Sequence, residues 1–358
     1  MDPLTQGALG AALPMAVAKR RQIGAALLVG AVAGMAADLD VLIRSTRDPL
    51  LFLEYHRQFT HSLFFIPFGA LACAALCHGL ARRRLQLGFA LTYLFALLGY
   101  ATHALLDACT SYGTLLLWPF SQQRFAWDTV SVIDPLVTLP LLGLVFLAAR
   151  RRTAGLAALA VAWVMFYQLL GYAQQQRALA MGWQLAAART HTPVHITAKP
   201  TIANILLWRT IYRHEGRFYS DGVRAGWRVQ AYPGSSIAVL DTARDYPWLA
   251  GGSQQARDIT RFERFSQGYT GVDEADPLRI IDMRYAMLPT EVDGLWGIEI
   301  NPQRPPAEHA EYVTKRNVSA ATRQRFWRML RGLELTPDGL SGAENATPHT
   351  KFYSKRPI

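Results

Sequence analysis

The chain has 358 residues, of which 51% are hydrophobic and 18% charged, and its formal net charge is +11. Residues 1–180 hold 14 Lys and Arg against 8 Asp and Glu, whereas residues 181–358 hold 23 against 18, so only the second half is densely charged. Three cysteines do not make a disulfide framework. The basic residues form loop clusters rather than a basic-aromatic face, so we expect no nucleic-acid partner.

The apolar residues of the first half form long runs. Roughly 20 apolar residues are needed to cross a bilayer, and four runs meet this length. Two earlier, shorter runs are rich in Gly and Ala, which is typical of closely packed helices. The predicted helices are residues 4–18, 22–37, 62–80, 85–106, 132–149 and 153–172. The sequence thus predicts an α-helical polytopic membrane domain of about six helices over residues 1–175, with a buried helical core of a soluble protein as the alternative.

Three basic clusters separate the predicted helices, at residues 19–21, 82–84 and 150–152. Cytoplasmic loops are enriched in Lys and Arg, so these three connections are predicted to face the cytoplasm of a bacterial inner membrane. Residues 38–61, residues 107–131 and everything after residue 172 would then lie on the periplasmic side. No positive charge precedes the first apolar run, so we predict no cleavable signal peptide. If one short helix does not cross, the sides are exchanged from that point on.

The composition changes after Tyr172. Residues 174–190 are typical of a helix that leaves the membrane, and alternating strand-like segments follow, namely "NILLWRTIY", "RFYSDG", "LRIIDMRYAML" and "LWGIEI". Helical patterns are present at about 252–266 and 319–333. We predict a soluble α+β domain over residues 190–335 and a polar tail over residues 336–358. This half shows no internal repeat, phosphate-binding loop or nucleophile elbow.

Six acidic and histidine side chains fall at predicted helix ends on one face of the membrane: Asp38, Asp40, His56, His61, His103 and Asp107. Ionisable groups at the edge of a membrane core are costly unless they have a function. Imidazole and carboxylate ligands together suit zinc, with manganese and iron as alternatives. The sequence therefore predicts a divalent metal site on the periplasmic face.

The spacing of these side chains assigns them different positions. His103 and Asp107 are four residues apart and share one face of a helix. Asp38 and Asp40 are two apart, so we predict that they lie where their helix ends. Thr60 is a predicted helix N-cap that would hold His61 in place. His56 lies on the preceding loop, where it either completes the metal shell or binds substrate.

Other charged groups of the first half are candidates for catalysis. Asp134 precedes Pro135, a pair that also signals a helix start. Asp40 or Asp134 would act as general base, and Arg57 would stabilise developing negative charge. Arg124 is a second candidate for holding a phosphate, or an anchor of an interfacial segment. The histidines of the second half have no ligand spacing, and we predict no metal ligands among His191, His195, His214, His309 and His349.

Five segments in this order resemble the YdjM family of inner-membrane-associated metal-dependent hydrolases: "MDPLTQGALG", "AADLD", "HRQFTHS", "ATHALLDACTSYGT" and "WPFS". The resemblance covers residues 1 to about 140, and "FERFSQGY" with "IIDMRYAM" resembles the extra domain of longer members. The family is distantly similar to zinc-dependent phospholipase C and to zinc nucleases. This similarity implies metal binding by Asp38 or Asp40, His61, His103 and Asp107.

One position departs from the family pattern. Many members carry a Thr-His pair where this chain has Thr5-Gln6, and Gln is a poor zinc ligand, so a site with one ion rather than two or three, or a degenerate one, are open alternatives. Two functions follow from the sequence. The first is a metal-dependent hydrolase that acts on a phosphoester of a lipid or lipid-linked substrate at the periplasmic membrane surface. The second is a non-enzymatic, metal-stabilised membrane module that scaffolds or regulates a partner protein.

Overall fold

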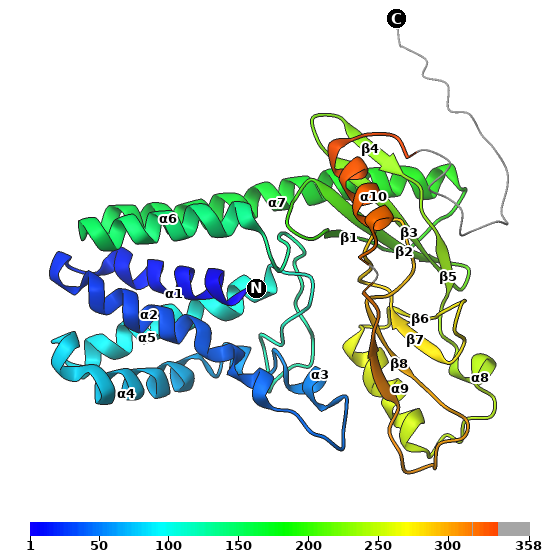
Figure 1. Cartoon of the computed structure of the whole chain (residues 1–358), viewed down its shortest axis with the longest axis horizontal. Coiled ribbons are helices and arrows are strands. Elements are labelled where there is room, and N and C mark those ends of the chain that lie inside the picture. The colour runs from blue at the N-terminus through cyan, green and yellow to red at the C-terminus, as the bar shows by residue number, and fades with distance from the viewer. Residues whose placement is uncertain (317, 336–358) are drawn as a thin grey trace, which may run out of the picture.

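The computed structural model describes residues 1–316 and 318–335, so the predicted polar tail lies outside the described residues. The chain forms a bundle of helices followed by a C-terminal region, residues 189–335, that contains two small antiparallel sheets (Figure 1). All helices of the bundle run along the long axis of the molecule, and the C-terminal region lies at one end of it.

Each of the six apolar runs forms a helix. The bundle consists of α1 (Pro3–Val17), α2 (Ile23–Ala36), α4 (Ile66–Leu85), α5 (Phe89–Ala108), α6 (Pro135–Arg151) and α7 (Ala154–Ala188). Short elements connect them: η1 (Arg20–Gln22), η2 (Ala37–Leu42), α3 (Leu51–Tyr55) and η3 (Phe59–His61). The helices predicted from apolar run length are therefore present, with α7 longer than its run.

The prediction of about six membrane spans is not confirmed. Within the described residues, three helical segments are long and apolar enough to cross a membrane: Arg20–Leu42, Phe89–Ala108 and Ala154–Ala188. A fourth span is counted if Leu51–His61 and Ile66–Gly79, which meet at an angle of 84°, form one broken crossing. Helices α1 and α6 have 15 and 17 residues. Both are shorter than the roughly 20 residues that a crossing takes, so the membrane-embedded part has three to four apolar helices of sufficient length.

The two ends of the bundle differ (Figure 1). The α1–α2 and α6–α7 connections, which carry two of the basic clusters, lie at the end remote from the C-terminal region. The start of α1, the segment from η2 to η3 and the long loop between α5 and α6 lie at the other end, next to that region. The polar segments predicted to share one face of the membrane therefore share one end of the bundle.

Glycines allow α1, α2 and α5 to touch. A Cβ atom on Gly30 would lie 2.3 Å from the carbonyl oxygen of Gly10, and one on Gly99 would lie 2.6 Å from the carbonyl oxygen of Gly30. Because only hydrogen atoms separate the backbones here, the helix axes approach closely, as small residues allow in membrane helices. This contact brings the C-terminal ends of α2 and α5 together.

Helix α7 connects the bundle to the first sheet. It has 35 residues, so the predicted helix leaving the membrane is the continuation of the last span. The strands of the first sheet are β1 (Ile196–Pro200), β2 (Leu207–His214), β3 (Arg217–Ala225), β4 (Val229–Tyr232) and β5 (Ser236–Ala238), in the order β1-β2-β3-β4 with β5 beside β3. The sheet packs against the outer half of α7, where Ala178 shares a buried core with Trp208 and Val223.

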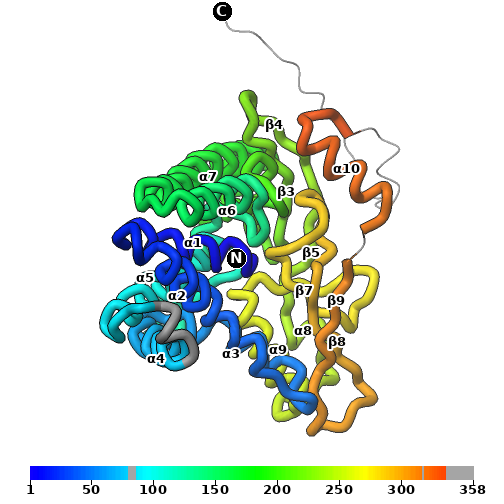
Figure 2. Tube along the Cα trace, turned by 60° about the vertical axis from the view of Figure 1, so that its left-hand side comes forward, coloured from blue at the N-terminus to red at the C-terminus, as the bar shows by residue number. Residues whose placement is uncertain are grey.

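The second sheet lies farther along the chain, in the order β6 (Thr270–Val272), β7 (Arg279–Asp282), β8 (Trp296–Glu299) and β9 (Glu311–Thr314). Three helices complete the region: α8 (Thr242–Asp245), α9 (Gln254–Phe265) and α10 (Ala320–Arg331). The four segments with strand patterns contain β2, β3, β7 and β8, and the two helical patterns contain α9 and α10. Helix α9 lies beside α3 (Figure 2), and Leu50 and Leu53 are buried in one cluster with Ile259 and Phe262.

Candidate metal centre

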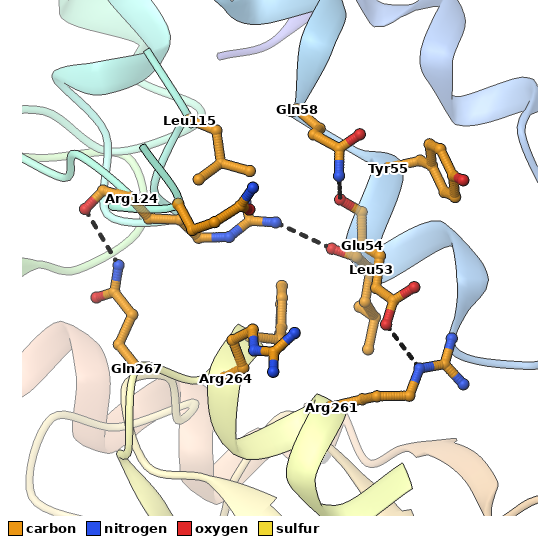
Figure 3. Close-up of a pocket in the computed structure, with 11 residues that line it drawn as sticks. Leu53, Glu54, Tyr55, Gln58, Leu115, Arg124, Arg261, Arg264 and Gln267 are labelled. Atoms are coloured by element: carbon orange, nitrogen blue, oxygen red, sulfur yellow. Dashed lines mark hydrogen bonds and ion pairs between the residues drawn. The ribbon is translucent and has the colours of Figure 1, made fainter. Parts of the chain in front are cut away.

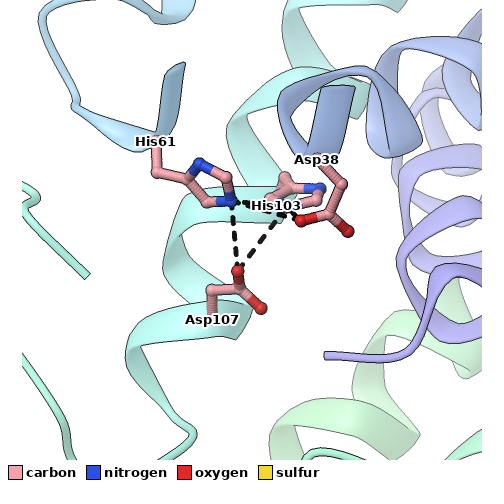
Figure 4. A group of neighbouring side chains, drawn as sticks. All are labelled: Asp38, His61, His103 and Asp107. Atoms are coloured by element: carbon pink, nitrogen blue, oxygen red, sulfur yellow. Dashed lines mark hydrogen bonds and ion pairs between the residues drawn. The ribbon is translucent and has the colours of Figure 1, made fainter. Parts of the chain in front are cut away.

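Four side chains from three elements converge at the end of the bundle that faces the C-terminal region (Figure 4). Asp38 comes from η2, His61 from η3, and His103 and Asp107 from α5. One donor atom of each lies within 4.8 Å of those of the other three, which is the separation expected of ligands around a single ion. Asp107 follows His103 by one helical turn, as their spacing predicts.

The nitrogen and oxygen atoms of this cluster point at a common centre. Nε2 of His61 lies 2.9 Å from Nε2 of His103. Oδ1 of Asp38 lies 3.5 and 3.3 Å from these two nitrogens, and Oδ2 of Asp107 lies 3.2 and 3.6 Å from them. Figure 4 shows both imidazoles and both carboxylates turned inward.

The other nitrogen of each imidazole is held by an acceptor. Nδ1 of His103 lies 2.6 Å from the carbonyl oxygen of Gly34, and Nδ1 of His61 lies 3.2 Å from Oδ2 of Asp40. Each acceptor favours the tautomer with its proton on Nδ1, so both Nε2 atoms carry lone pairs. Two lone pairs that face each other at 2.9 Å repel unless a cation lies between them, so the donor set fits a metal.

Asp107 supplies a second sign of a missing cation. Its side chain is fully buried; Oδ1 accepts a hydrogen bond of 2.9 Å from Nε2 of Gln6 and contacts the amino group of Met1. Oδ2 lies 3.0 Å from Nε of Arg57. No donor among the described residues is directed at Oδ2 in hydrogen-bond geometry. A buried carboxylate oxygen without a donor is costly, and a metal ion would satisfy it.

Asp40 holds the segment that carries His61. Its Oδ1 lies 2.8 Å from Nδ1 of His56, and its Oδ2 accepts hydrogen bonds of 2.9 Å from both the Arg57 amide and the Thr60 hydroxyl. Asp40 and His56 also form a second candidate ligand group with Asp38. The prediction that Thr60 caps a helix was wrong, because Thr60 lies inside η3 and α4 begins only at Ile66. Its hydroxyl instead binds Asp40.

Arg57 places a positive charge beside the cluster. The residue is 4% exposed and has a positive φ of 60°, a conformation that turns the chain sharply between His56 and Gln58. Its Nη1 donates to Oγ1 of Thr110 at 2.8 Å, and its guanidinium lies over the ring of Tyr112 at 4.9 Å. The Tyr112 and Thr110 contacts fix the guanidinium next to Asp107. Sequence reasoning missed both residues, because no motif marks them.

Two other predicted groups lie apart from the four-residue cluster. Asp134 caps α6, as its pairing with Pro135 predicts, by accepting from the amide of Leu136 at 3.1 Å and from the hydroxyl of Tyr167 at 2.9 Å. Arg124 donates to the carbonyl oxygens of Gly113 and Leu53, each at 3.1 Å. Burial lowers the pKa of the Arg124 guanidinium to about 10, and the nearby guanidiniums act in the same direction. Arg124 therefore fastens the loop after α5 to α3.

The cluster has one open side. The side chains of His61, His103 and Asp107 are fully buried, whereas that of Asp38 is 23% exposed. Asp38 is followed by Leu39, which is 63% exposed, and Leu42, which is 75% exposed. Access to the centre thus runs past Asp38, beside apolar side chains in the last turn of a candidate span.

The C-terminal region lies beside the centre without entering it. Within the described residues, both candidate ligand groups come from residues 38–107, and His191, His195, His214 and His309 belong to neither. His349 lies outside the described residues. The region instead supports the surrounding loops: the Tyr285 hydroxyl donates to the Ser111 carbonyl oxygen at 2.5 Å. The sequence contains no local signal for such long-range contacts.

Comparison with known proteins assigns the helical half of the chain. The sequence profile of the YdjM inner membrane protein family matches residues 1–178. The uncharacterized protein YfhP of Bacillus subtilis (strain 168) is 23% identical over 270 residues, which are 73% of this chain and 77% of YfhP. Inner membrane protein YbcI of Escherichia coli (strain K12) is 34% identical over 110 residues, which are 30% of this chain and 61% of YbcI.

No solved structure matches the chain significantly. The matched residues 1–178 contain every side chain of the candidate metal centre and the three segments able to span a membrane by length and composition. The family and these segments together support a location in a membrane. Through its first 178 residues, the chain belongs to the YdjM inner membrane protein family.

Proposed function

We propose that the protein is a membrane-bound, metal-dependent hydrolase that acts on a phosphoester of a lipid or lipid-linked substrate. The observation that carries the proposal is the pair of opposed Nε2 atoms of His61 and His103, 2.9 Å apart, with one carboxylate oxygen each from Asp38 and Asp107 beside them. This donor set suits zinc, and manganese or iron would also accept it. When bound, a divalent cation supplies Lewis acidity and lowers the pKa of a coordinated water.

The residues around the cluster suit such a reaction. Asp40 fixes His61 through Nδ1, which orients the imidazole and raises its basicity as a ligand. Both oxygens of Asp40 already accept from neighbours, so we assign it an orienting role rather than that of general base. Arg57, held beside Asp107, would stabilise negative charge that develops on a phosphoryl oxygen.

The position of the open side supports a lipid substrate. Asp38 lies on η2, in the last turn of the candidate span Arg20–Leu42, and Leu39 and Leu42 beside it expose their side chains. A headgroup could reach Asp38 while its acyl chains remain against these leucines. A soluble substrate would gain nothing from such a surface.

We further propose that the centre and the C-terminal region face the periplasm, since basic connections lie at the opposite end of the bundle. Cysteines introduced near residue 85 or near residue 230, in a variant without Cys73, Cys77 and Cys109, would be labelled from outside intact cells. Labelling near 230 alone is expected. Labelling near 85 alone would invert the orientation.

The hydrolase proposal is tested with purified full-length protein that has been loaded with zinc, manganese or iron. A panel of phospholipids is offered with and without a chelator, and released phosphate or phosphorylated headgroup is measured. Turnover that the chelator abolishes and that His103→Ala lacks would support the proposal. Absence of turnover from a protein that binds metal would favour the alternative below.

The alternative is a non-enzymatic module in which the metal stabilises the end of the bundle and presents the C-terminal region to a partner. One observation favours it: four protein donors surround the centre, and four donors complete a tetrahedral structural zinc site. X-ray absorption spectroscopy of the zinc-loaded protein separates the two. A water oxygen among the ligands favours catalysis, whereas four protein ligands favour structure.

A further inference from the structure

A cavity of about 250 Å³ lies outside the metal centre, between α3, the loop after α5 and α9 (Figure 3). Its lining combines three arginines, one glutamate and three glutamines with a few apolar side chains. Arg124 comes from the loop after α5, and Arg261 and Arg264 come from α9. Three arginines against Glu54 give the lining a formal charge of +2. An excess of positive charge in a cavity attracts an anion.

The three arginines differ in how their charge is balanced. Arg261 is neutralised, because it bonds Glu54 at 2.6 Å, Asp48 at 2.8 Å and Asp258 at 3.0 Å. Arg124 binds only backbone carbonyl oxygens, which are neutral, and so keeps its full charge. Arg264 is therefore the next group to consider.

The side chain of Arg264 has no hydrogen-bond or ion-pair partner among the described residues. Figure 3 shows its guanidinium inside the ring of lining residues, between the side chains of Arg124 and Arg261. Since the one glutamate of the lining is bound by Arg261, Arg124 and Arg264 together lack a counter-charge. An unpaired guanidinium presents a fork of donors that matches a phosphate or carboxylate group.

We propose that this cavity binds a phosphoryl group, either of a small phosphate ester or of a phospholipid headgroup. About 250 Å³ is less than the roughly 300–1,000 Å³ of pockets for drug-sized ligands, so the space suits a phosphate with a small polar substituent. The cavity is built from residues that follow the spans Arg20–Leu42 and Phe89–Ala108 by a few turns or a short loop. This is the level at which lipid headgroups lie.

The cavity is separate from the metal centre. Arg124 reaches the backbone carbonyl of His56, and the ring of Tyr112 lies between the rings of Phe265 and His56, at 5.4 and 5.3 Å. None of the four clustered ligands lines the cavity. The inference therefore does not depend on the proposed hydrolase activity, and a bound phosphoryl group would bridge α9 to the loop after α5.

The test uses full-length protein in detergent after treatment with a chelator, so that phosphate cannot bind through a metal. Binding of inorganic phosphate and of glycerol phosphate is measured by calorimetry, and binding of bilayer nanodiscs that contain phosphatidylglycerol or only phosphatidylcholine is measured in parallel. Arg264→Gln removes the unpaired charge without breaking a printed-chain contact of its side chain, so the variant should fold. Arg213→Gln, an exposed arginine of β2 that lines no cavity described above, is the matched control.

We expect the chelated wild type and Arg213→Gln to bind one of the phosphate probes, or the anionic nanodiscs, and Arg264→Gln to bind at least about 10-fold more weakly, as the loss of a charge-assisted hydrogen bond would cause. Preference for anionic nanodiscs would assign the group to a lipid, and preference for glycerol phosphate to a soluble ester. Equal binding by wild type and Arg264→Gln would overturn the proposal. So would binding that the chelator abolishes, or the absence of binding to every probe.

Discussion

The helical bundle and the C-terminal region both bury acidic side chains, but they balance the charge differently. In the C-terminal region buried acids have basic partners: Asp282 pairs with Arg284 at 2.7 Å, and Asp221 pairs with Arg189 at 2.6 Å. At the end of the bundle three carboxylates, Asp38, Asp40 and Asp107, lie around two imidazoles and share one guanidinium. The first arrangement is complete in itself, whereas the second fits an additional cation.

This difference explains why one region holds the candidate site. A buried ion pair with matched partners stabilises or orients a fold and offers no free donor. The bundle instead leaves two Nε2 lone pairs and one carboxylate oxygen directed at the same point. The four predictions below compare the two regions directly.

The largest effect is expected at a ligand. His103→Ala removes one of the two opposed nitrogens, and we expect metal affinity to fall by more than about 100-fold, because even loss of a partner that only orients a ligand costs roughly 10–100-fold. Competition with a chromophoric chelator measures it. His309→Ala, which removes a histidine paired with Asp258 in the C-terminal region, should leave the affinity unchanged. Equal losses in the two variants would remove the distinction between the regions.

Breaking a closed pair should affect stability instead of metal binding. Arg284→Met leaves the fully buried Asp282 without its cation, and we expect a loss of about 3–5 kcal/mol. Adding Asp282→Leu should recover part of this loss, since the unpaired charge is then gone. Thermal unfolding in detergent measures the effect and elemental analysis measures the metal. Metal loss from a folded Arg284→Met protein would mean that the two regions are not independent.

Asp40 tests the boundary between ligand and support. Asp40→Asn weakens the anchor of His61 and His56 while the shape of the side chain is retained. We expect metal affinity to fall by roughly 10–100-fold, less than for His103→Ala. Titration with the same chelator gives the comparison. A loss as large as that of His103→Ala would make Asp40 a ligand.

The smallest effect concerns the joint between the regions, where Asp48 binds Arg261 at 2.8 Å. Burial raises the pKa of Asp48, but the hydrogen bonds from Arg261 and the Leu50 amide outweigh it, so its pKa lies below the ordinary value near 3.9. A carboxyl group with a lowered pKa in the folded state stabilises the fold above about pH 4, and this contribution is lost as the pH falls further.

Because Asp48 is partly exposed, its contribution should stay below about 1 kcal/mol. Unfolding of the wild type and of Asp48→Asn, measured between about pH 3 and pH 7, should differ slightly at neutral pH and converge in acid. A difference that grows as the pH falls would contradict the assigned sign.

Much of the helical half could be predicted from the sequence, because run length and residue spacing are local properties. Apolar runs located the helices, and the four-residue spacing of His103 and Asp107 placed them on one face of α5. The count of membrane spans was less accurate, since 15- and 17-residue helices such as α1 and α6 are apolar without being long enough.

Contacts between distant segments could not be predicted. The carbonyl oxygen of Gly34 that holds His103 belongs to the backbone and carries no sequence signal. The assignment of Thr60 as a cap failed because its hydroxyl binds Asp40, twenty residues away. Likewise, the sequence placed Asp134 among the catalytic candidates, whereas its carboxylate binds Leu136 and Tyr167 at the start of α6.

The most direct test of the account is the metal content of purified protein. Elemental analysis of full-length wild type, without added metal and after loading with zinc, should find about one divalent ion per chain, as one tetrahedral donor set predicts. His61→Ala that still inserts and folds should contain none after the same loading, and His56→Ala should contain less than wild type. Wild-type protein that binds no divalent metal, or His61→Ala that retains a full complement, would contradict the central claim.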